Sequence, residues 1–358
     1  MRRNNHEKNK NLCFDNGYFL DCCCCGGSCI GYPNQLKHSR DNRHDFPGFC
    51  GGSRELAEVS QKQMNQGDNL QLTNLNEIRA LLGRHGFRFS KSMGQNFLID
   101  PSIPVRIADS VLADESCGVL EIGPGIGCLT AELAKRAGKV LAVELDRSLQ
   151  PLLNETLANS ENVVILYSDI MKQDIRRLVE ENLPQQTKLV CANLPYNITT
   201  PVLTALVQTD CFERICVMIQ KEVAERICAG PGGKDYGAFS LLMQWYCETE
   251  LLFTVPPHCF LPQPKVTSAV IRLIRREKPP SDVQDAQLMF RVIRAAFNQR
   301  RKTLVNALTS AIPGLNKEDC ERILKRFDLD INIRGEKLYL GDFARISNEI
   351  NVLTENNL

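Results

Sequence analysis

The sequence predicts an α/β protein with a mostly parallel sheet, followed by a small all-helical C-terminal domain. Between residues 118 and 229, short apolar runs alternate with amphipathic segments of helical period. This rhythm is typical of a parallel sheet that helices cover on both faces. From about residue 281 to 353, the apolar positions follow helical spacing only. A chain of 358 residues is long enough for both domains.

The predicted elements follow from these runs in chain order. Five apolar runs are expected to form parallel strands: Gly118–Ile122, Val140–Glu144, Val163–Tyr167, Lys188–Ala192 and Ile215–Ile219. Helices are expected at Asn76–His85, Pro101–Leu112, Leu129–Arg136, Ser148–Asn159, Ile175–Glu181, Pro201–Gln208 and Lys221–Ala229. The segment FRFSKSMGQNFLID (87–100) is expected to be a polar loop. Leu251–Val255 and Val266–Ile274 resemble a closing pair of strands around a Pro-rich loop.

Composition excludes several classes of protein. The 43 Lys and Arg residues balance 42 Asp and Glu residues, which excludes an overall basic coat but not a local basic patch. No run of 18 apolar residues is present, and the N-terminus lacks the apolar core of a secretory signal. We therefore expect a cytoplasmic protein without a membrane partner. No zinc-finger spacing occurs among the 16 Cys, so no metal site is expected.

Residues 1–63 differ from the rest of the chain. They are rich in Asn, Gly, Cys and Ser, include the tract CCCCGGSC, and have no helical or strand periodicity. We expect a disordered Cys-rich leader at 1–63, an α/β domain at 64–280 and a helical domain at 281–358. Met64 is a candidate for the natural start. A transit segment, a palmitoylated cluster or a metal tract are alternative interpretations, and the acids of the leader weaken the first.

A glycine-rich turn follows the first predicted strand. In VLEIGPGIGCLT (119–130), Gly123, Gly125 and Gly127 allow a tight turn and a close approach of backbone to ligand. The spacing is GxGxG rather than the dinucleotide pattern GxGxxG. Glu144 ends the second predicted strand and Asp169 follows the third. Because parallel strands end at a common edge, these acceptors predict a nucleoside site there.

This set of residues resembles the class I S-adenosylmethionine-dependent methyltransferases, which have a Rossmann-like fold. The resemblance implies S-adenosyl-L-methionine as the cofactor. It implies that Gly123 contacts the methionine portion, Glu144 the ribose and Asp169 the adenine. It also implies a seven-stranded sheet with one antiparallel strand.

The fourth predicted strand ends in ANLPYNITTP (192–201), and its Asn-Leu-Pro-Tyr resembles the catalytic tetrad of methyltransferases that act on base amines. The adenine amine is a poor nucleophile because its lone pair is delocalised into the ring. The Asn193 side-chain oxygen and the Leu194 carbonyl are candidate acceptors for its hydrogens, and Pro195 would stiffen the turn. Tyr196 offers a ring on which an extruded base can stack.

Several longer segments are similar to the ribosomal RNA adenine dimethyltransferases, above all to the bacterial small-subunit branch. They are KSMGQNFLID (91–100), QKEVAERICAGPGGKDYGAFSLLMQWY (220–246), LLFTVPPHCFLPQPKVTSAVIRL (251–273) and AAFNQRRKTLVNAL (295–308). The resemblance implies that Asn96, Leu98 and Asn193 contact the cofactor. It implies dimethylation of two adjacent adenosines in a hairpin loop near the 3′ end of 16S rRNA, in an immature small subunit. We expect a monomer.

An RNA partner agrees with the charge pattern. Residues 255–326 hold 14 Lys and Arg against 6 Asp and Glu, and such patches neutralise phosphates. The candidate RNA-binding residues are Arg88, Lys91, Arg300, Arg301 and Lys302, the last three in an NQRRK run expected at the start of a helix. Phe260 is a candidate for the second side of an aromatic clamp on the base, or alternatively a core residue. A large-subunit dimethylase of the macrolide-resistance type and an assembly factor that acts mainly by binding are the alternative functions.

Overall fold

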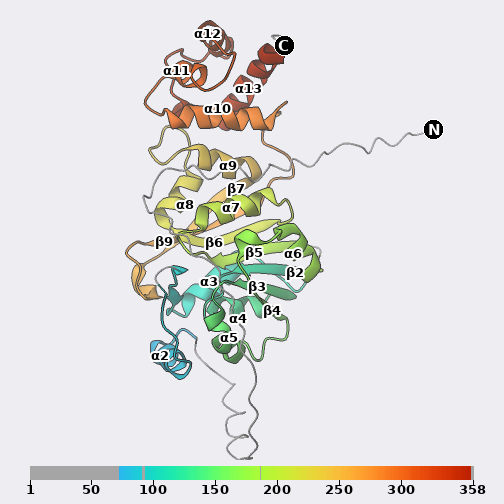
Figure 1. The fold of residues 1–358 in the computed structure, drawn as a ribbon, viewed down its shortest axis with the longest axis vertical. Coiled ribbons are helices and arrows are strands. Elements are labelled where there is room, and N and C mark those ends of the chain that lie inside the picture. The colour runs from blue at the N-terminus through green and yellow to red at the C-terminus, as the bar shows by residue number, and fades with distance from the viewer. Residues whose placement is uncertain (1–71, 91–92, 186, 356–358) are drawn as a thin grey trace, which may run out of the picture. The chain divides into compact units, whose positions relative to one another are not determined.

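The computed structural model describes residues 72–90, 93–185 and 187–355. The expected leader at 1–63, the candidate start at Met64 and the candidate RNA-binding residue Lys91 lie outside the described residues. The fold is the predicted α/β architecture, a seven-stranded sheet with helices on both faces (Figure 1).

The sheet has the order β4-β3-β2-β5-β6-β9-β7. Its strands are β2 (Cys117–Ile122), β3 (Lys139–Glu144), β4 (Val163–Tyr167), β5 (Thr187–Asn193), β6 (Arg214–Gln220), β7 (Cys247–Val255) and β9 (Ser268–Arg275). β9 pairs antiparallel with both of its neighbours, while the pairs among β2 to β6 are parallel. The expected seven strands with one antiparallel strand are therefore confirmed. The strand order reverses at β2, which lies between β3 and β5.

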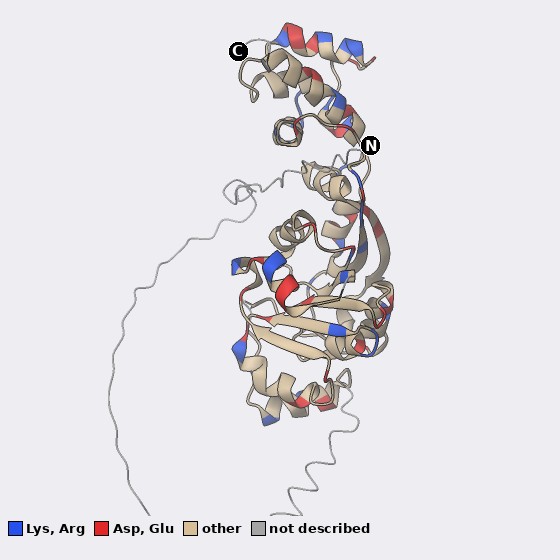
Figure 2. Ribbon diagram, turned by 90° about the vertical axis from the view of Figure 1, so that its right-hand side faces the viewer, with Lys and Arg blue, Asp and Glu red and all other residues tan. Residues whose placement is uncertain are grey.

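Alternating side chains bind helices to the two faces of the sheet, because successive residues of a strand point to opposite sides. Val119 of β2 packs in one apolar cluster with α3 (Ser102–Ser110) and α4 (Cys128–Ala134). Leu120 packs in a different cluster with α6 (Ile175–Asn182) and α7 (Thr199–Gln208). A third cluster joins α2 (Leu75–Arg84) to α5 (Gln150–Thr156). Charged positions lie mostly on helices and loops rather than on the central strands (Figure 2).

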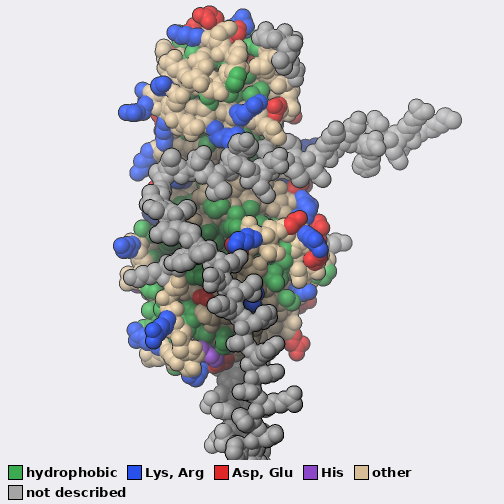
Figure 3. Space-filling model, in the orientation of Figure 1, with side chains coloured by type: hydrophobic (Ala, Val, Ile, Leu, Met, Phe, Trp, Pro, Cys, Tyr) green, Lys and Arg blue, Asp and Glu red, His purple; other side chains and the backbone are tan. Residues whose placement is uncertain are grey.

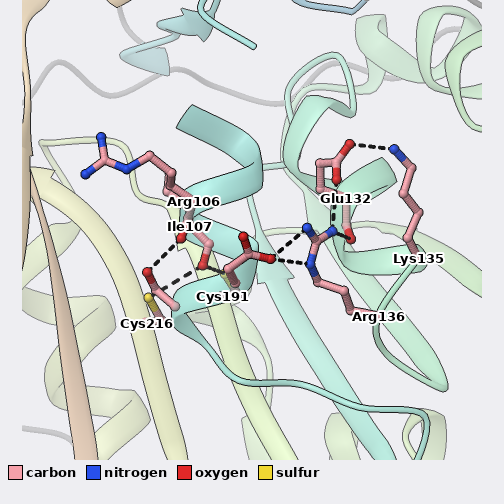
Figure 4. Close-up of polar contacts among 9 residues, drawn as sticks. Arg106, Ile107, Glu132, Lys135, Arg136, Cys191 and Cys216 are labelled. Atoms are coloured by element: carbon pink, nitrogen blue, oxygen red, sulfur yellow. Dashed lines mark hydrogen bonds and ion pairs between the residues drawn. The ribbon is translucent and has the colours of Figure 1, made fainter. Parts of the chain in front are cut away.

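The C-terminal part of α3 is held by donors from the sheet. The Ile107 carbonyl accepts hydrogen bonds from the buried thiols of Cys191 and Cys216, at 3.8 and 3.9 Å (Figure 4). These two cysteines are register partners on β5 and β6. No described cysteine forms a disulfide, and most of them are buried, as expected for small core residues.

The sequence analysis missed three elements. Helix α9 (Ala238–Tyr246) follows α8 (Lys221–Cys228), and the short strands β1 (Phe97–Leu98) and β8 (Phe260–Leu261) pair with each other. Both short strands fall in segments expected to be loops, because two-residue strands leave no periodic pattern. The 3-10 helices are η2 (Arg147–Leu149), η3 (Ile170–Lys172), η4 (Pro257–Cys259) and η5 (Gly335–Lys337).

The C-terminal residues are helical, as predicted: α10 (Ala286–Asn298), α11 (Leu304–Thr309), α12 (Lys317–Arg326) and α13 (Leu340–Glu355). Their core is continuous with that of the sheet. The Trp245 ring of α9 lies edge-on to the Phe290 ring of α10, with centroids 6.1 Å apart. The Tyr236 hydroxyl donates to the Leu338 carbonyl at 2.9 Å. The domain boundary between residues 280 and 281 stays a prediction.

Close packing of η5 on α10 generates a stability prediction. A Cβ added at Gly335 would lie 2.6 Å from the Ala296 Cβ, and neither group can rotate away. We expect Gly335→Ala to lower the free energy of unfolding by about 1–3 kcal/mol. The matched control is Gly83→Ala, because no atom lies within 4 Å of the added Cβ in exposed helix α2. That change should raise stability by about 0.5–1 kcal/mol. Urea denaturation measures both, and equal effects would contradict the packing argument.

Candidate active site at the carboxyl edge of the sheet

One large cavity opens at the carboxyl ends of β2, β3, β4 and β5. It is lined by the glycine turn, by acids that follow the strands, by residues 93–98 and by residues 193–198. The cavity encloses about 1110 Å³, its open mouth included. Ligands of open α/β sheets bind at this edge, where the strand order reverses.

The glycine turn has the backbone conformation that its sequence predicts. Gly123, Gly125 and Gly127 have φ values of 72°, 61° and 90°, which only glycine adopts without strain. A Cβ at Gly125 would lie 3.1 Å from the Phe97 ring, and one at Gly127 would lie 3.1 Å from the Thr156 hydroxyl. The turn therefore leaves bare backbone against the cavity, with no room for side chains behind it.

The two predicted nucleoside-binding acids both line the cavity. Glu144 ends β3, and its carboxylate accepts hydrogen bonds from the backbone N–H groups of Gly125 at 3.3 Å and Asp146 at 2.8 Å. Asp169 follows β4 and caps η3 by accepting from the Met171 N–H at 3.0 Å. Leu145 lines the cavity beside Glu144 with 52% of its surface exposed, and the sequence analysis did not single it out.

Glu121 also lines the cavity, although it is not among the residues expected to contact the cofactor. It is the next-to-last residue of the buried strand β2, just before the glycine turn, and is 1% exposed. Its Oε2 atom has no hydrogen-bond partner within the described chain. Burial raises the pKa of Glu121 to about 8, and the nearby Glu144 acts in the same direction. An unpartnered carboxyl in a cavity wall suits a ligand with a cationic group.

Residues 94–98 close another wall of the cavity. The Asn193 side-chain amide donates to the Asn96 carbonyl at 3.2 Å, and the Asn96 amide donates to the Gly94 carbonyl at 3.0 Å. Leu98 also lines the cavity and is 4% exposed. The structure therefore brings the expected cofactor residues Asn96, Leu98 and Asn193 together, although 97 positions separate Asn96 from Asn193.

The tetrad lies where β5 ends, and its four residues all line the cavity. Because the Asn193 Nδ2 atom is bound to Asn96, its Oδ1 atom is the one left to accept a hydrogen bond. Leu194 is 1% exposed and its N–H donates to the Met218 carbonyl at 3.1 Å. The hydroxyl of the half-buried Tyr196 is within 2.7 Å of the Ser268 hydroxyl, which anchors the ring at the cavity wall.

Phe260 is not brought into the cavity. It is 2% exposed in strand β8 and packs in the apolar cluster of α3 and α4. It does not line the cavity, although its register partner Leu98 does. The aromatic clamp stays a prediction, and in this conformation Phe260 is a core residue.

The basic candidates have different environments. Arg300 is engaged within the protein: its guanidinium donates to Glu336, to the Lys234 carbonyl and to the Gly233 carbonyl, at 2.6, 2.6 and 2.9 Å. Arg301, Lys302 and Arg88 are exposed and make no ion pair with described residues, and Arg88 is not among the residues that line the cavity. The NQRRK run was expected at a helix start, but it lies between the end of α10 and the start of α11.

The sheet order, the left-handed glycine turn and the polar residues at four strand ends define a class I methyltransferase. Within that class, the chain belongs to the ribosomal RNA adenine dimethylase family, because the sequence model of that family matches residues 86–352. No helix within the described residues is long and apolar enough to span a membrane.

Named relatives and solved structures are similar over most of this chain. The ribosomal RNA small subunit methyltransferase A of Geobacillus sp. (strain WCH70) is 47% identical, covering 76% of this chain and 95% of that protein. The protein of the same name from Bacillus mycoides (strain KBAB4) is 46% identical, with shares of 77% and 96%. A dimethyladenosine transferase from Plasmodium falciparum has the same fold, with a TM-score of 0.61, 24% identity and shares of 72% and 98%. The 23S rRNA methyltransferase ErmE has a TM-score of 0.56, 26% identity and shares of 71% and 99%.

The raised pKa of Glu121 predicts a pH dependence of stability. The folded protein holds this proton up to about pH 8, whereas the unfolded chain releases it near pH 4.5. The folded state therefore binds more protons between these values, so the Glu121 contribution to stability must fall as pH rises through them. The slope from one group is at most about 1.4 kcal/mol per pH unit.

Glu121→Gln removes this titration, because the amide is neutral at every pH. We expect the stability of the variant relative to the unsubstituted protein to increase from pH 5 to pH 8. Urea denaturation at several pH values measures the difference. A difference that stays constant over this range would contradict the assignment.

Proposed function

We propose that this protein transfers methyl groups from S-adenosyl-L-methionine to N6 of two adjacent adenosines near the 3′ end of 16S rRNA. The observation that carries the proposal is the arrangement of Asn193 and Tyr196 at the wall of a nucleoside-sized cavity. The family membership and the small-subunit relatives support the same reaction and the same subunit.

The cavity residues fit the proposed cofactor. The bare backbone of the glycine turn gives room for the methionine portion, and the unpartnered Glu121 oxygen suits its ammonium group. Glu144 is positioned to accept from ribose hydroxyls and Asp169 from the adenine amine, with Leu145 beside them. When bound, S-adenosyl-L-methionine supplies an electrophilic methyl group on a sulfonium centre.

The tetrad would prepare the acceptor base. The Asn193 Oδ1 atom and the Leu194 carbonyl accept hydrogen bonds from the adenine amine, which localises the nitrogen lone pair toward the methyl donor. Asn96 holds the Asn193 amide in one orientation, so little reorganisation is needed when the base arrives. The Tyr196 ring, anchored through Ser268, offers a stacking surface for the extruded base.

The RNA partner is supported by a basic surface around Arg300. The side chains of Lys234, Arg301, Lys302 and Lys337 are exposed and have no ion pair within the described residues. Arg300 joins their three segments through its hydrogen bonds to residues 233, 234 and 336. Figure 3 shows Lys and Arg side chains over the C-terminal helices on the face drawn there. Such a surface suits the phosphates of a folded RNA.

Further details of the proposal rest on the resemblance to the bacterial small-subunit dimethyltransferases. The substrate is an immature small subunit, the enzyme acts as a monomer in the cytoplasm, and residues 64–280 and 281–358 act as catalytic and RNA-binding domains. The fold also accommodates a large-subunit enzyme, because ErmE shares it. An assembly factor that acts mainly by binding is the remaining alternative.

Methyl-label transfer separates these functions. Purified protein and labelled cofactor are incubated with isolated small subunits or with protein-free large-subunit RNA, and the modified adenines are identified by mass spectrometry. We expect dimethyladenosine in the small-subunit RNA only. Labelling of large-subunit RNA alone would reverse the choice of substrate, and binding without any labelling would favour the assembly factor.

The role of the tetrad predicts a separation of binding from chemistry. Asn193→Ala removes an acceptor used in the transition state, so we expect kcat to fall about 10²–10³-fold. Binding of small subunits should persist, because Asn193 lies in the cavity rather than on the basic surface. Tyr196→Phe keeps the ring and loses only the Ser268 contact, so it should be much less damaging than Tyr196→Ala. Unchanged methyl transfer by Asn193→Ala would refute the assignment.

If the basic surface binds phosphates, replacing its cations should change how the affinity for small subunits depends on salt. Replacing exposed Arg301 and Lys302 together by Ala should weaken binding to small subunits and reduce the slope of log K against log salt by about 1.4. Arg79→Ala is the control, since this cation is exposed and unpaired within the described residues and lies outside the basic 255–326 segment. Arg300→Ala should instead lower the melting temperature, because its donors are used inside the protein. Equal salt slopes for the double variant and its control would exclude Arg301 and Lys302 as phosphate contacts.

A further inference from the structure

Gln95 connects the wall segment 93–98 to the loop that follows β3. Its Nε2 atom donates to the Asp146 Oδ2 atom at 2.6 Å, across 51 positions of sequence. Its Oε1 atom accepts from the Ser90 N–H at 3.0 Å. Both ends of one amide are therefore used, one within its own loop and the other across to the loop that follows β3.

Asp146 is in turn joined to the predicted ribose-binding acid. Its backbone N–H donates to the Glu144 Oε1 atom at 2.8 Å. Its Oδ1 atom accepts from the N–H and hydroxyl of Ser148, at 3.0 and 2.6 Å. Burial raises the pKa of Asp146, but the hydrogen bonds from Ser148 and Gln95 outweigh it and leave the pKa below its usual value. The carboxylate is thus fixed by Ser148, and Oδ2 is the atom that meets Gln95.

The next residue of the same segment reaches the reaction side. The Asn96 carbonyl accepts from the Asn193 amide at 3.2 Å. Gln95 therefore binds the loop that follows β3, and the next residue, Asn96, binds Asn193 of the tetrad at the end of β5. A displacement of this segment would move the supports of Glu144 and Asn193 together.

We propose that Gln95 is a positioning residue, which latches the 93–98 segment onto Asp146 and thereby sets the affinity of the cavity for S-adenosyl-L-methionine. This inference rests on the proposed function and adds to it a residue that does not itself need to touch the methyl group. In this role the Gln95 amide uses both of its ends, one on Ser90 and the other on Asp146.

The rest of the segment should stay folded without the latch. Phe97 and Leu98 are each 4% exposed, and strand β1 pairs with β8. The Phe97 ring also packs on Phe87 and Phe89, with centroids 5.9 and 5.1 Å away. Loss of one amide contact therefore changes the position of the loop rather than the stability of the core.

The first experiment measures cofactor affinity by calorimetry, together with KM and kcat for methyl transfer. Gln95→Ala should raise the Kd and KM for S-adenosyl-L-methionine about tenfold and change kcat at saturating cofactor by less than about threefold. Gln150→Ala is the matched control, because Gln150 is exposed at the start of α5 and its side chain makes no hydrogen bond to described residues. The control should leave both constants unchanged.

A second set of variants exchanges donor and acceptor. Gln95→Glu places two carboxylates together, so affinity should fall at neutral pH and partly recover as pH is lowered and one carboxyl takes up a proton. The other charged groups near Asp146 are Glu144 and Arg147, and neither variant alters them. Combining Gln95→Glu with Asp146→Asn restores a hydrogen bond at unchanged net charge. We expect this double variant to bind the cofactor within about threefold of the unsubstituted protein.

The outcomes separate the inference from the proposed function. If Gln95→Ala binds the cofactor normally, or if the double variant is no better than Gln95→Glu, the latch is wrong while the proposed function stands. If the unsubstituted protein neither binds the cofactor nor methylates small-subunit RNA, the proposed function itself fails. Should Gln95→Ala not fold, the cofactor affinities of Gln95→Glu and of the double variant still test whether the contact between residues 95 and 146 sets the affinity.

Discussion

The site depends on one constraint: β2 to β5 are parallel and neighbouring, so their carboxyl ends meet at one edge of the sheet. Glu121, Glu144, Asp169 and Asn193 end or follow these strands and therefore line one cavity. The three glycines with positive φ complete this arrangement, because that backbone conformation strains other residues and a side chain at Gly125 or Gly127 would crowd Phe97 or α5. Backbone geometry, rather than attraction between the acids, brings the polar groups together.

The two buried acids at this edge, Glu144 and Glu121, are held differently. Glu144 accepts from two N–H groups, whereas Glu121 keeps an oxygen without a partner in a buried wall. An unpartnered buried carboxyl costs stability unless it stays protonated or meets a ligand. The protein therefore carries an unfavourable group at the place where a cationic ligand would relieve it, which is a common feature of binding sites.

The C-terminal helices are part of the same apolar core and are not loosely appended. Trp245 packs on Phe290, and Arg300 ties the end of α10 to the 230–234 loop and to Glu336. These contacts hold the segment in which the exposed Arg301 and Lys302 lie. For a substrate as large as a ribosomal subunit, contacts far from the reacting base can then orient that base.

The sequence alone determined the strands, the glycine turn, the acids at the strand ends and the tetrad, because apolar period and turn chemistry are local properties. It did not determine that Arg300 serves the protein's own packing, that Phe260 is buried in this conformation, or that residues 97–98 and 260–261 form paired strands. Nor could it reveal the contacts of Asn96 with Asn193 and of Gln95 with Asp146. These features join residues about 35 to 160 positions apart, and only the folded chain decides which of many polar side chains meet.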